Sequence, residues 1–588
     1  MLRLPSDAAF DSHKVITTFG VVARALTRFA RQPHNPVVPV NEIEVIPEPA
    51  TPVARVAVCP SWVYYAALVL VIAATVMIRL HLRNFPLERD EGEYAYAGQL
   101  MLQGIPPYKL AYNMKLPGTY AAYAAIMAVF GQTPSGIHDG LLILNVLTIW
   151  FVFLLGARLF GRLAGVTAAA SYALLAMSPS VEGFAGHASH FVVFFAVAGM
   201  LLLLKAERAA KASLLFASGL LFGLAFLMKQ PGILFAVFAA LYLFLTEALN
   251  AVKAHRSFRW KAMAESQGIL GLGVTLPFLL TCLLLWRAGV FRAFWFWTFT
   301  YARQYVGIAD MPAGWLHFKT YVPVAIGPSW PLWALAGVGL SAPWWNTKIR
   351  AQAIFLFPLL LCSFLAVCPG LYFREHYFVL MLPALAILVG AAVESVTQKL
   401  PSGMARMAPM GVFVALCLLT LAPQWNFLLR MPIDSACRAV YGFNPFPEAI
   451  PIAEYIKSHS APGSTLAVLG SEPEIYFYSG RHSATGFIYT YELMEAQPYA
   501  SQMQRDMVRE IEASRPEFIV IVYVTTSWLA HPESDRFILD WSTSYAHAHY
   551  QLVGIADILP QTQYRWGADV RGYQRRSTFG VEIYKKVR

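Results

Sequence analysis

The chain has 588 residues, of which 57% are hydrophobic and only 13% are charged, and its formal net charge is +11. Soluble domains carry about 25% charged residues, so this composition excludes an ordinary soluble protein and indicates a chain that crosses a membrane many times. The sequence contains no nucleic-acid-binding motif. Basic loops that face anionic lipid head groups explain the positive charge, and the expected partners include membrane lipids but no nucleic acid.

The first 60 residues mix polar and apolar side chains and carry six Lys and Arg. They lack the short basic segment followed by an apolar core that marks a cleavable signal peptide. The sequence therefore predicts a cytoplasmic tail over residues 1–60. Within this tail, "RQPHNPVVPVNEIEVIPEPATPV" is a proline-rich, flexible lead-in to the first apolar segment.

Eleven segments approach the length of about 20 apolar residues that a membrane span needs. Together they define a transmembrane module over residues 61–424, with a long first outer loop at 81–136. An odd number of spans places the two chain ends on opposite sides of the membrane. The predicted spans are 62–80, 137–157, 163–180, 189–204, 213–228, 231–248, 266–286, 321–342, 352–368, 376–393 and 408–424.

Lys and Arg residues are unevenly divided between the two sets of connections that join these spans. The connections on one side hold 13 Lys and Arg in 52 residues, whereas those on the other side hold 11 in 113. Cytoplasmic loops are enriched in Lys and Arg, so the denser set and the amino-terminal tail are predicted to be inside. The long loops and the C-terminal region then lie outside the cytoplasmic (inner) membrane.

Residues 425–588 differ from the apolar module in pattern. "STLAVLG" and "EFIVIVYV" are typical of buried strands. "PEAIPIAEYIKSH" and "YASQMQRDMVREIEASR" show the apolar stripe of amphipathic helices. Strands that alternate with helices indicate a soluble, extracytoplasmic α/β domain, and its length is sufficient for a core of its own.

Four carboxylates, Glu88, Asp90, Glu91 and Glu93, fall within six positions directly after the first predicted span. On a helix that begins near Asp90, Glu93 and Tyr94 share its face, whereas Glu91 points about 100° away. One explanation is that a helix dipole favours acidic residues at the helix N-terminus. Carboxylates at a membrane interface are costly and usually functional, so Asp90 is predicted to be a general base that takes a proton from an attacking hydroxyl.

Basic groups lie in the loops of the same predicted side. Lys115 precedes an apolar segment, 117–130, that is too short to span and is expected to lie along the interface. Lys229 occupies the tight turn "MKQPG", and Arg374 and His376 lie in "YFREHYF". Basic side chains near span ends commonly reach for lipid head groups. Their common side with Asp90 favours a single cavity instead, where charge-assisted contacts suit a phosphate ligand.

The other predicted cavity residues come from the same motifs. His187 and His190 share one helical face in "EGFAGHASH", but two histidines without a third ligand do not indicate a metal site. Six scattered cysteines form no zinc or disulfide pattern, so no metal and no cofactor is predicted. The aromatic stretch 292–307 is either an interfacial helix or the wall of a lipid or sugar groove. The predicted cavity residues are Glu93, Tyr94, His187, His190, Glu375 and Tyr377.

Several motifs resemble those of the GT-C glycosyltransferases, over roughly residues 60 to 395. "ERDEGEYAYAGQLMLQG" followed by "YNMKLPGTYAAYAAIMAVFG" is similar to the first outer loop of the protein O-mannosyltransferase and lipid A aminoarabinose transferase group. "GLAFLMKQPGILFA" and "REHYFVLMLPALAIL" resemble a lysine-containing turn and a late span of that group. Each motif alone is loose, and their order and common side make the match specific.

The resemblance implies a GT-C catalytic module and a GT-C reaction. Such enzymes move a sugar from a polyprenyl-phosphate carrier to a hydroxyl acceptor outside the cytoplasmic membrane and invert the anomeric carbon. The acceptor can be a glycan, a lipid or a protein. By position, Asp90 with its neighbour Glu91 is the catalytic pair. Four residues are implied to hold the donor phosphate, namely Lys115, Lys229, Arg374 and His376.

Two departures from that group leave the donor sugar open. Glu93 stands where the group commonly has Arg, and Ser189 or His190 stands where it tends to have a second acid. A metal-dependent oligosaccharyl transferase or a polysaccharide polymerase is therefore the nearest alternative. A transporter of lipid-linked sugars is a further one, although it would place polar or broken spans near the bilayer midplane, in two related halves. The C-terminal domain is expected to contact the acceptor or to act as a lid.

Overall fold

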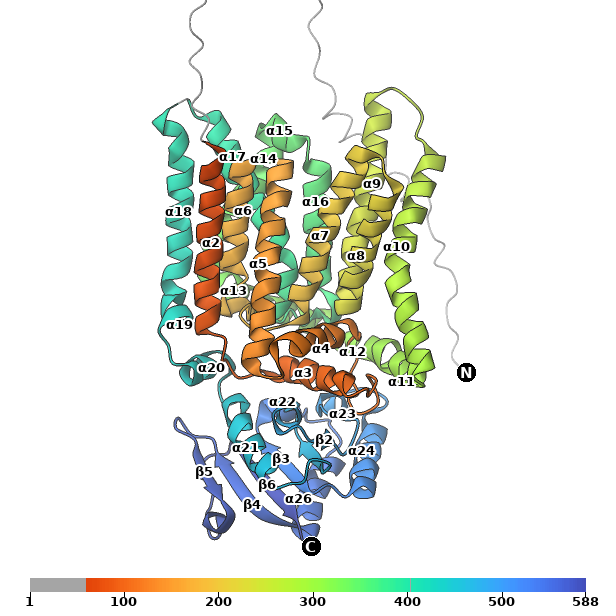
Figure 1. Cartoon of the computed structure of the whole chain (residues 1–588), viewed down its shortest axis with the longest axis vertical. Coiled ribbons are helices and arrows are strands. Elements are labelled where there is room, and N and C mark those ends of the chain that lie inside the picture. The colour runs from red at the N-terminus through yellow and green to blue at the C-terminus, as the bar shows by residue number, and fades with distance from the viewer. Residues whose placement is uncertain (1–59, 402, 588) are drawn as a thin grey trace, which may run out of the picture. The chain divides into compact units, whose positions relative to one another are not determined.

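The computed structural model describes residues 60–401 and 403–587 (Figure 1). The predicted cytoplasmic tail, including its proline-rich tract, lies outside these residues except for Pro60. The described chain consists of a bundle of apolar helices, followed by a domain that contains a six-stranded sheet. The prediction of a multi-span helical membrane protein with a C-terminal α/β domain is confirmed.

Eight helices in the described part of the chain are long and apolar enough to cross a membrane, with one of them interrupted. Four shorter apolar helices accompany them. The long ones are α2 (Ser61–His81), α5 (Pro134–Leu159), α7 (Ala188–Ala209), α9 (Ile233–Lys253), α10 (Trp260–Arg287), α13 with α14 (Met311–Ile326 and Trp330–Trp345), α17 (Leu382–Lys399) and α18 (Ala408–Leu421), the last of which reaches the length of a span together with its flanking turns and α19 (Trp425–Leu429), over Met404–Leu429. The short ones are α4 (Gly118–Phe130), α6 (Arg162–Leu175), α8 (Ala212–Met228) and α16 (Ala353–Val367).

Every predicted span falls on a helix. The predicted span 321–342 lies within one candidate membrane span, Met311–Trp345, which a 3-10 turn at Gly327–Ser329 interrupts between α13 and α14. Pro328, inside this turn, has no backbone N–H to donate to the helical hydrogen bonds. Helices α6, α8 and α16 have 14 to 17 residues and rise only about 21–26 Å. They are shorter than a full span.

Two helices of the first loop lie across one end of the bundle, between it and the C-terminal domain (Figure 1). They are α3 (Arg89–Leu102) and α4, which pack against each other. Helix α3 begins at Glu88, whose side chain accepts hydrogen bonds from the backbone N–H groups of Asp90 and Glu91. Helix α4 contains the apolar segment that was expected at the interface.

The C-terminal sheet has the order β2-β1-β3-β6-β4-β5. Its first three strands in this order run parallel, and β6, β4 and β5 continue it with antiparallel pairs. The predicted strands and amphipathic helices are confirmed as β1, β3, α21 and α24. The bounds are β1 Thr465–Leu469, β2 His482–Ser483, β3 Phe518–Tyr523, β4 Tyr550–Asp557, β5 Gln563–Trp566, β6 Gly580–Lys586, α21 Phe446–Ser458, α22 Glu474–Ser479, α24 Ala500–Ser514 and α26 Phe537–His549.

Short helices connect these larger elements. They include α11 (Phe291–Trp295), a π-helical segment (Phe296–Tyr301), α12 (Ala302–Val306), α15 (Thr347–Arg350), α19 (Trp425–Leu429), α20 (Ile433–Tyr441), α23 (Tyr491–Met494) and α25 (Thr525–Trp528).

A buried arginine fastens helix α3 to the C-terminal domain. The Arg89 Nε group donates a hydrogen bond to the Ser471 carbonyl at 2.5 Å, and its Nη2 group lies 2.9 Å from the Glu472 carboxylate. Glu472 is fully buried. Nearby, a Cβ added at Gly92 would lie 2.7 Å from the Glu474 backbone nitrogen, so only glycine allows α3 to approach α22 this closely.

Replacing this arginine should loosen the C-terminal domain. Arg89→Met leaves Glu472 buried without its cation, and breaking such a buried pair costs about 3–5 kcal/mol. We expect a lower unfolding temperature and faster proteolysis near residues 430–445, followed by gel analysis of the purified protein. Arg83→Met is the matched control, because its pair with Asp139 is partly exposed and such pairs contribute about 0–1 kcal/mol. Equal protease resistance of Arg89→Met and wild type would contradict the role of this contact.

Candidate active site

One cavity lies where the end of the bundle, the first loop and the C-terminal domain meet. Its walls combine acidic, basic and aromatic side chains from segments that are far apart in the sequence. The predicted base and the four predicted phosphate ligands all line this cavity. Glu91, the second predicted catalytic acid, does not. Its lining includes Asp90, Tyr94, Lys115, Lys229, Tyr301, Tyr305, Arg374, His376, Tyr377, Tyr489, Tyr491, Glu492 and Glu495.

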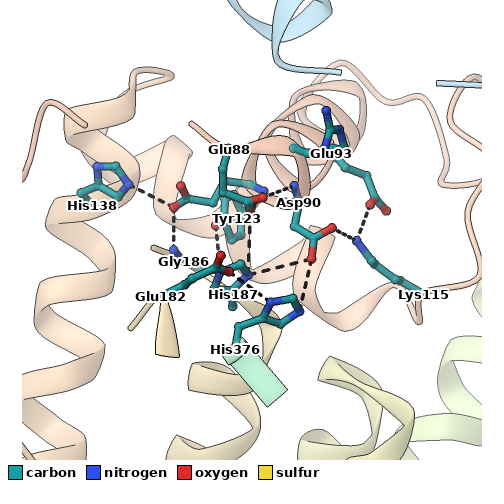
Figure 2. A network of polar contacts seen from close by, with 12 residues as sticks. Glu88, Asp90, Glu93, Lys115, Tyr123, His138, Glu182, Gly186, His187 and His376 are labelled. Atoms are coloured by element: carbon teal, nitrogen blue, oxygen red, sulfur yellow. Dashed lines mark hydrogen bonds and ion pairs between the residues drawn. The ribbon is translucent and has the colours of Figure 1, made fainter. Parts of the chain in front are cut away.

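Asp90 lies in the first turn of α3 and shares a lysine with Glu93 (Figure 2). The Lys115 ammonium is 2.7 Å from Asp90 Oδ1 and 2.6 Å from Glu93 Oε2. Glu93 is fully buried and also accepts a hydrogen bond from the Tyr120 hydroxyl. Asp90 keeps its other oxygen for the cavity and accepts from the Tyr489 hydroxyl at 3.2 Å on Oδ1.

The charge of Lys115 determines the protonation state of Asp90. Burial alone would raise the pKa of the Asp90 carboxyl, but the adjacent Lys115 ammonium and the nearby histidines lower that pKa well below its usual range. The pKa of Glu93 is raised by burial, which outweighs its own contact with Lys115. Asp90 is therefore an ionised carboxylate whose proton-accepting oxygen faces the cavity.

A second layer of contacts orients two histidines toward Asp90. The Glu182 carboxylate lies 3.2 Å from His187 Nε2 and is hydrogen-bonded to His376 Nδ1, also at 3.2 Å. The two imidazole rings stack with centroids 4.2 Å apart, and the other nitrogen of each ring lies 3.9 Å from Asp90 Oδ2. Although burial opposes it, the two histidine contacts lower the pKa of Glu182 to about 2. Glu182 thus acts as an ionised anchor for both rings.

Glu182 and Glu88 are functional candidates that the sequence analysis did not select. Glu182 lies in the quoted motif "EGFAGHASH" and has φ 50, in the left-handed region that non-glycine residues rarely adopt. Glu88 caps α3 and lies 3.7 Å from His187. Burial and the neighbouring Asp90 charge raise the pKa of Glu88 to about 8. A carboxylate directly before a histidine-rich loop was the available sequence signal for Glu182.

Glu91, which was predicted to act together with Asp90, does not line the cavity. Glu91 is 1% exposed, and its Oε1 accepts from the Gly186 N–H at 2.6 Å and contacts His138 Nε2 at 3.0 Å. In Figure 2 these two partners lie on the other side of Asp90 from Lys115. The offset of about 100° between neighbouring helical residues carries it away from the cavity. Glu91 therefore joins α3 to α5 and to the loop before α7.

Four predicted cavity residues lie outside the lining, namely Glu93, His187, His190 and Glu375. His187 precedes α7 and contacts Glu182, whereas His190 is one turn into α7 and fully buried. Glu375 follows Arg374 in sequence, but only Arg374 lines the cavity. Tyr94 and Tyr377 do line the cavity, as predicted.

Two cations of the cavity have no carboxylate partner among the described residues. Lys229 lies between α8 and α9, with its ammonium 4.1 Å from the Tyr377 ring centroid. The Arg374 guanidinium lies 5.6 Å from the Tyr372 ring centroid. Burial, helped by the charges of Lys115 and Arg374, lowers the pKa of Lys229 to about 7. An anionic ligand in the cavity would therefore meet two cations that form no ion pair with an acid of the described chain.

Residues far from the recognised motifs form the rest of the wall. The aromatic stretch 292–307 contributes Tyr301 and Tyr305, so its prediction as a groove wall holds for this face. The C-terminal domain contributes Tyr489, Tyr491, Glu492 and Glu495. No local pattern marks these four residues, because they reach the cavity only through packing between segments about 400 positions apart in sequence.

The donor set around Asp90 also matches a divalent cation in type. Asp90, His187 and His376 each offer one ligand atom, and these atoms lie within 4.8 Å of one another. Imidazole and carboxylate groups are common zinc ligands. Each histidine uses one ring nitrogen on Glu182 and directs the other at Asp90, which is how outer-shell carboxylates orient ligating histidines.

Part of the sequence matches the model of a known protein family. Residues 115–280 match the family model of dolichyl-phosphate-mannose-protein mannosyltransferases. This matched segment contains Lys115, Glu182, His187 and Lys229. No curated protein matches the chain.

Two solved membrane enzymes have a similar structure. ArnT from Cupriavidus metallidurans, solved with undecaprenyl phosphate, is 16% identical with a TM-score of 0.52, and the match covers 89% of this chain and 98% of ArnT. The oligosaccharyltransferase AglB from Archaeoglobus fulgidus, solved with an inhibitory peptide and a dolichol-phosphate, is 13% identical with a TM-score of 0.51. That match covers 86% of this chain and 74% of AglB. At such identities the likeness shows the fold. Together with the family match over residues 115–280, it makes the chain similar to membrane glycosyltransferases of the GT-C type.

Proposed function

We propose that the protein transfers a sugar, with inversion, from a polyprenyl-phosphate donor to a hydroxyl acceptor. The observation that carries this proposal is the presence of one ionised carboxylate, Asp90, and two unpaired cations, Lys229 and Arg374, in the same cavity. Similar structures that hold undecaprenyl phosphate and dolichol-phosphate support a lipid-phosphate ligand. The acceptor is a glycan, a lipid or a protein hydroxyl.

The chemistry follows from the two kinds of charge. Asp90 takes the proton of the acceptor hydroxyl as its oxygen attacks the anomeric carbon. The bond from that carbon to the phosphate oxygen breaks on the opposite face, so the anomeric configuration inverts. The electron pair stays on the phosphate, where Lys229 and Arg374 stabilise the growing negative charge in a site with little water.

The geometry divides the four predicted phosphate ligands into two groups. Lys115 already contacts two carboxylates, so in this proposal it orients Asp90 and keeps it ionised. His376 contacts Glu182 and faces Asp90, which supports the same orienting role. Lys229 and Arg374 remain for the phosphate.

We further propose that the reaction takes place outside the cytoplasmic membrane. The Lys and Arg bias of the connections supports an inside location for the amino-terminal tail. The cavity, the first loop and the C-terminal domain are at one end of the bundle (Figure 1). In this topology all three face outward, where an envelope acceptor would be available.

A metal-dependent transfer, as in an oligosaccharyl transferase or a polysaccharide polymerase, is the second candidate. The cluster of Asp90, His187 and His376 favours it, since these groups together could hold a divalent cation. Such an ion would supply Lewis-acid stabilisation of the reacting oxygens. In that case the two histidines would act as its ligands instead of as neighbours of a free base.

Asp90→Asn should remove transfer and leave donor binding intact. The amide keeps the size of the side chain but cannot accept the proton, and a general base contributes about 10²–10⁴-fold in rate. We would measure surface glycans and lipid-linked sugars by mass spectrometry in cells that carry either variant, together with undecaprenyl phosphate binding by the purified proteins. Asp139→Asn, outside the cavity, is the control. Wild-type product levels with Asp90→Asn would refute the assignment.

The affinity for undecaprenyl phosphomannose, a phosphodiester, should fall as pH rises through 7. Lys229, with its pKa lowered to about 7, is charged below that pH and neutral above it, whereas a phosphodiester stays anionic throughout. Between pH 6 and pH 8.5 we expect a loss of about tenfold, measured as Kd by tryptophan fluorescence. Lys229→Arg keeps its charge and should bind with little pH dependence. An unchanged pH profile in that variant would exclude Lys229 as the titrating phosphate ligand.

Removal of divalent ions separates the two candidate functions. If Asp90 acts as a free base, transfer in washed membranes should continue at its full rate after treatment with EDTA, because no step needs an ion. Loss of product with EDTA, followed by recovery on addition of Zn²⁺, Mg²⁺ or Mn²⁺, would support the metal-dependent candidate. The same assay with His187→Ala would then show loss of the recovery.

A further inference from the structure

A buried carboxylate of the C-terminal domain faces the cavity without a partner. Glu492 lies in α23, is 5% exposed and lines the cavity. Its Oε1 atom has no hydrogen-bond partner in the part of the chain that the structure describes. A buried polar group left unpaired costs about 1–3 kcal/mol. The mechanism above does not use this group, so its position indicates a contact that only a ligand can complete.

A second carboxylate extends the same wall. Glu495 follows α23, lines the cavity and accepts a hydrogen bond from the Tyr301 hydroxyl. Burial raises the pKa of both Glu492 and Glu495. A carboxyl group in this state can both accept and donate hydrogen bonds. Tyr489 and Tyr491 also line the cavity and add aromatic faces to this wall.

Contacts of neighbouring residues locate this wall between the base and the phosphate cations. Tyr489, three residues before Glu492, donates a hydrogen bond to Asp90 Oδ1 at 3.2 Å, which places this segment beside the base. Glu495 accepts from Tyr301, and Tyr305, one turn further on, stacks on the Tyr372 ring next to Arg374, which places Glu495 toward the phosphate end. In a displacement at the anomeric carbon, the sugar ring lies between the attacking hydroxyl and the leaving phosphate. The two carboxyl groups therefore face the position of that ring.

We propose that Glu492 and Glu495 form a subsite that binds the hydroxyl or amino groups of the donor sugar. This inference rests on the proposed function, and it deepens that function by assigning sugar recognition to the C-terminal domain. Hydroxyl and ammonium groups both donate hydrogen bonds to a carboxyl oxygen, and such contacts would complete the unpaired Glu492. A site built to hydrogen-bond a substrate group rejects analogues that lack it strongly.

The contacts between α3 and the C-terminal domain explain how residues of that domain can keep a fixed position relative to Asp90. Arg89, next to Asp90 in sequence, lies 5.4 Å from the Tyr491 ring centroid and pairs with Glu472. The Tyr489 hydroxyl donates to the Arg89 carbonyl at 2.9 Å. The first residue of α23 and the segment just before it are thus tied to the helix that carries the base. Glu492 is a specificity-determining residue in this proposal, and Asp90 remains the catalytic one.

The test compares a lipid phosphate with and without a sugar. Kd values would be measured for purified full-length wild type, Glu492→Gln and Glu495→Gln with three probes: undecaprenyl phosphate, undecaprenyl phosphomannose and an undecaprenyl phosphate that carries an amino sugar. We expect wild type to prefer one sugar-bearing lipid. Glu492→Gln should bind undecaprenyl phosphate normally and lose about fivefold or more on that preferred lipid, and Glu495→Gln should lose less.

Controls separate this inference from the proposed function. Glu454→Gln, at an exposed position on α21, should change nothing, and Arg374→Ala should weaken all three probes. Failure of wild type to bind any probe would overturn the proposed function and this subsite together. A sugar preference unchanged in both glutamine variants would overturn the subsite alone. An equal loss of affinity for undecaprenyl phosphate in Glu492→Gln would also overturn the subsite. Normal donor binding in that variant, together with a raised KM for the acceptor, would do so as well.

Discussion

The contact on which the site depends is the lysine shared between two acids of one helical face. Asp90 and Glu93 are one turn apart on α3, and Lys115 returns from the following loop to contact both. Without that cation, two carboxylates in a buried site would repel each other and take up protons. With it, Asp90 stays ionised while facing a cavity that has little water. The position of Asp90 on α3, the path of the loop that carries Lys115 and the protonation state of Asp90 therefore depend on one another.

Opposite charges are kept apart elsewhere in the cavity. The acids cluster around Asp90 and Glu182, and each has a basic partner. Lys229 and Arg374 have aromatic neighbours instead of acidic ones. An aromatic face stabilises a cation without neutralising it, so Arg374, and Lys229 while it is protonated, attract an anion into the cavity. This division allows one small space to hold both a proton acceptor and a receiver of negative charge.

Sequence patterns predicted the helical bundle, the α/β domain and the gathering of four distant motifs, because hydropathy and loop charge act over whole segments. They did not predict details that depend on a single turn of backbone. Glu91 and His190 were assigned to the cavity, and each helix carries them to another face. Glu492 and Tyr489 had no local signal at all, because their position follows from the packing of two distant parts of the chain. Roles inferred for the site residues remain predictions.

The contact between Arg89 and the Ser471–Glu472 segment joins positions that are 382 and 383 residues apart. During synthesis the amino-terminal partner leaves the ribosome long before the other exists, so for most of that time α3 has no surface to cover it. The membrane helices can insert in order, but the reaction chamber closes only when the last part of the polypeptide arrives. The cavity is therefore complete only late in biogenesis, once the C-terminal residues that line it have been made.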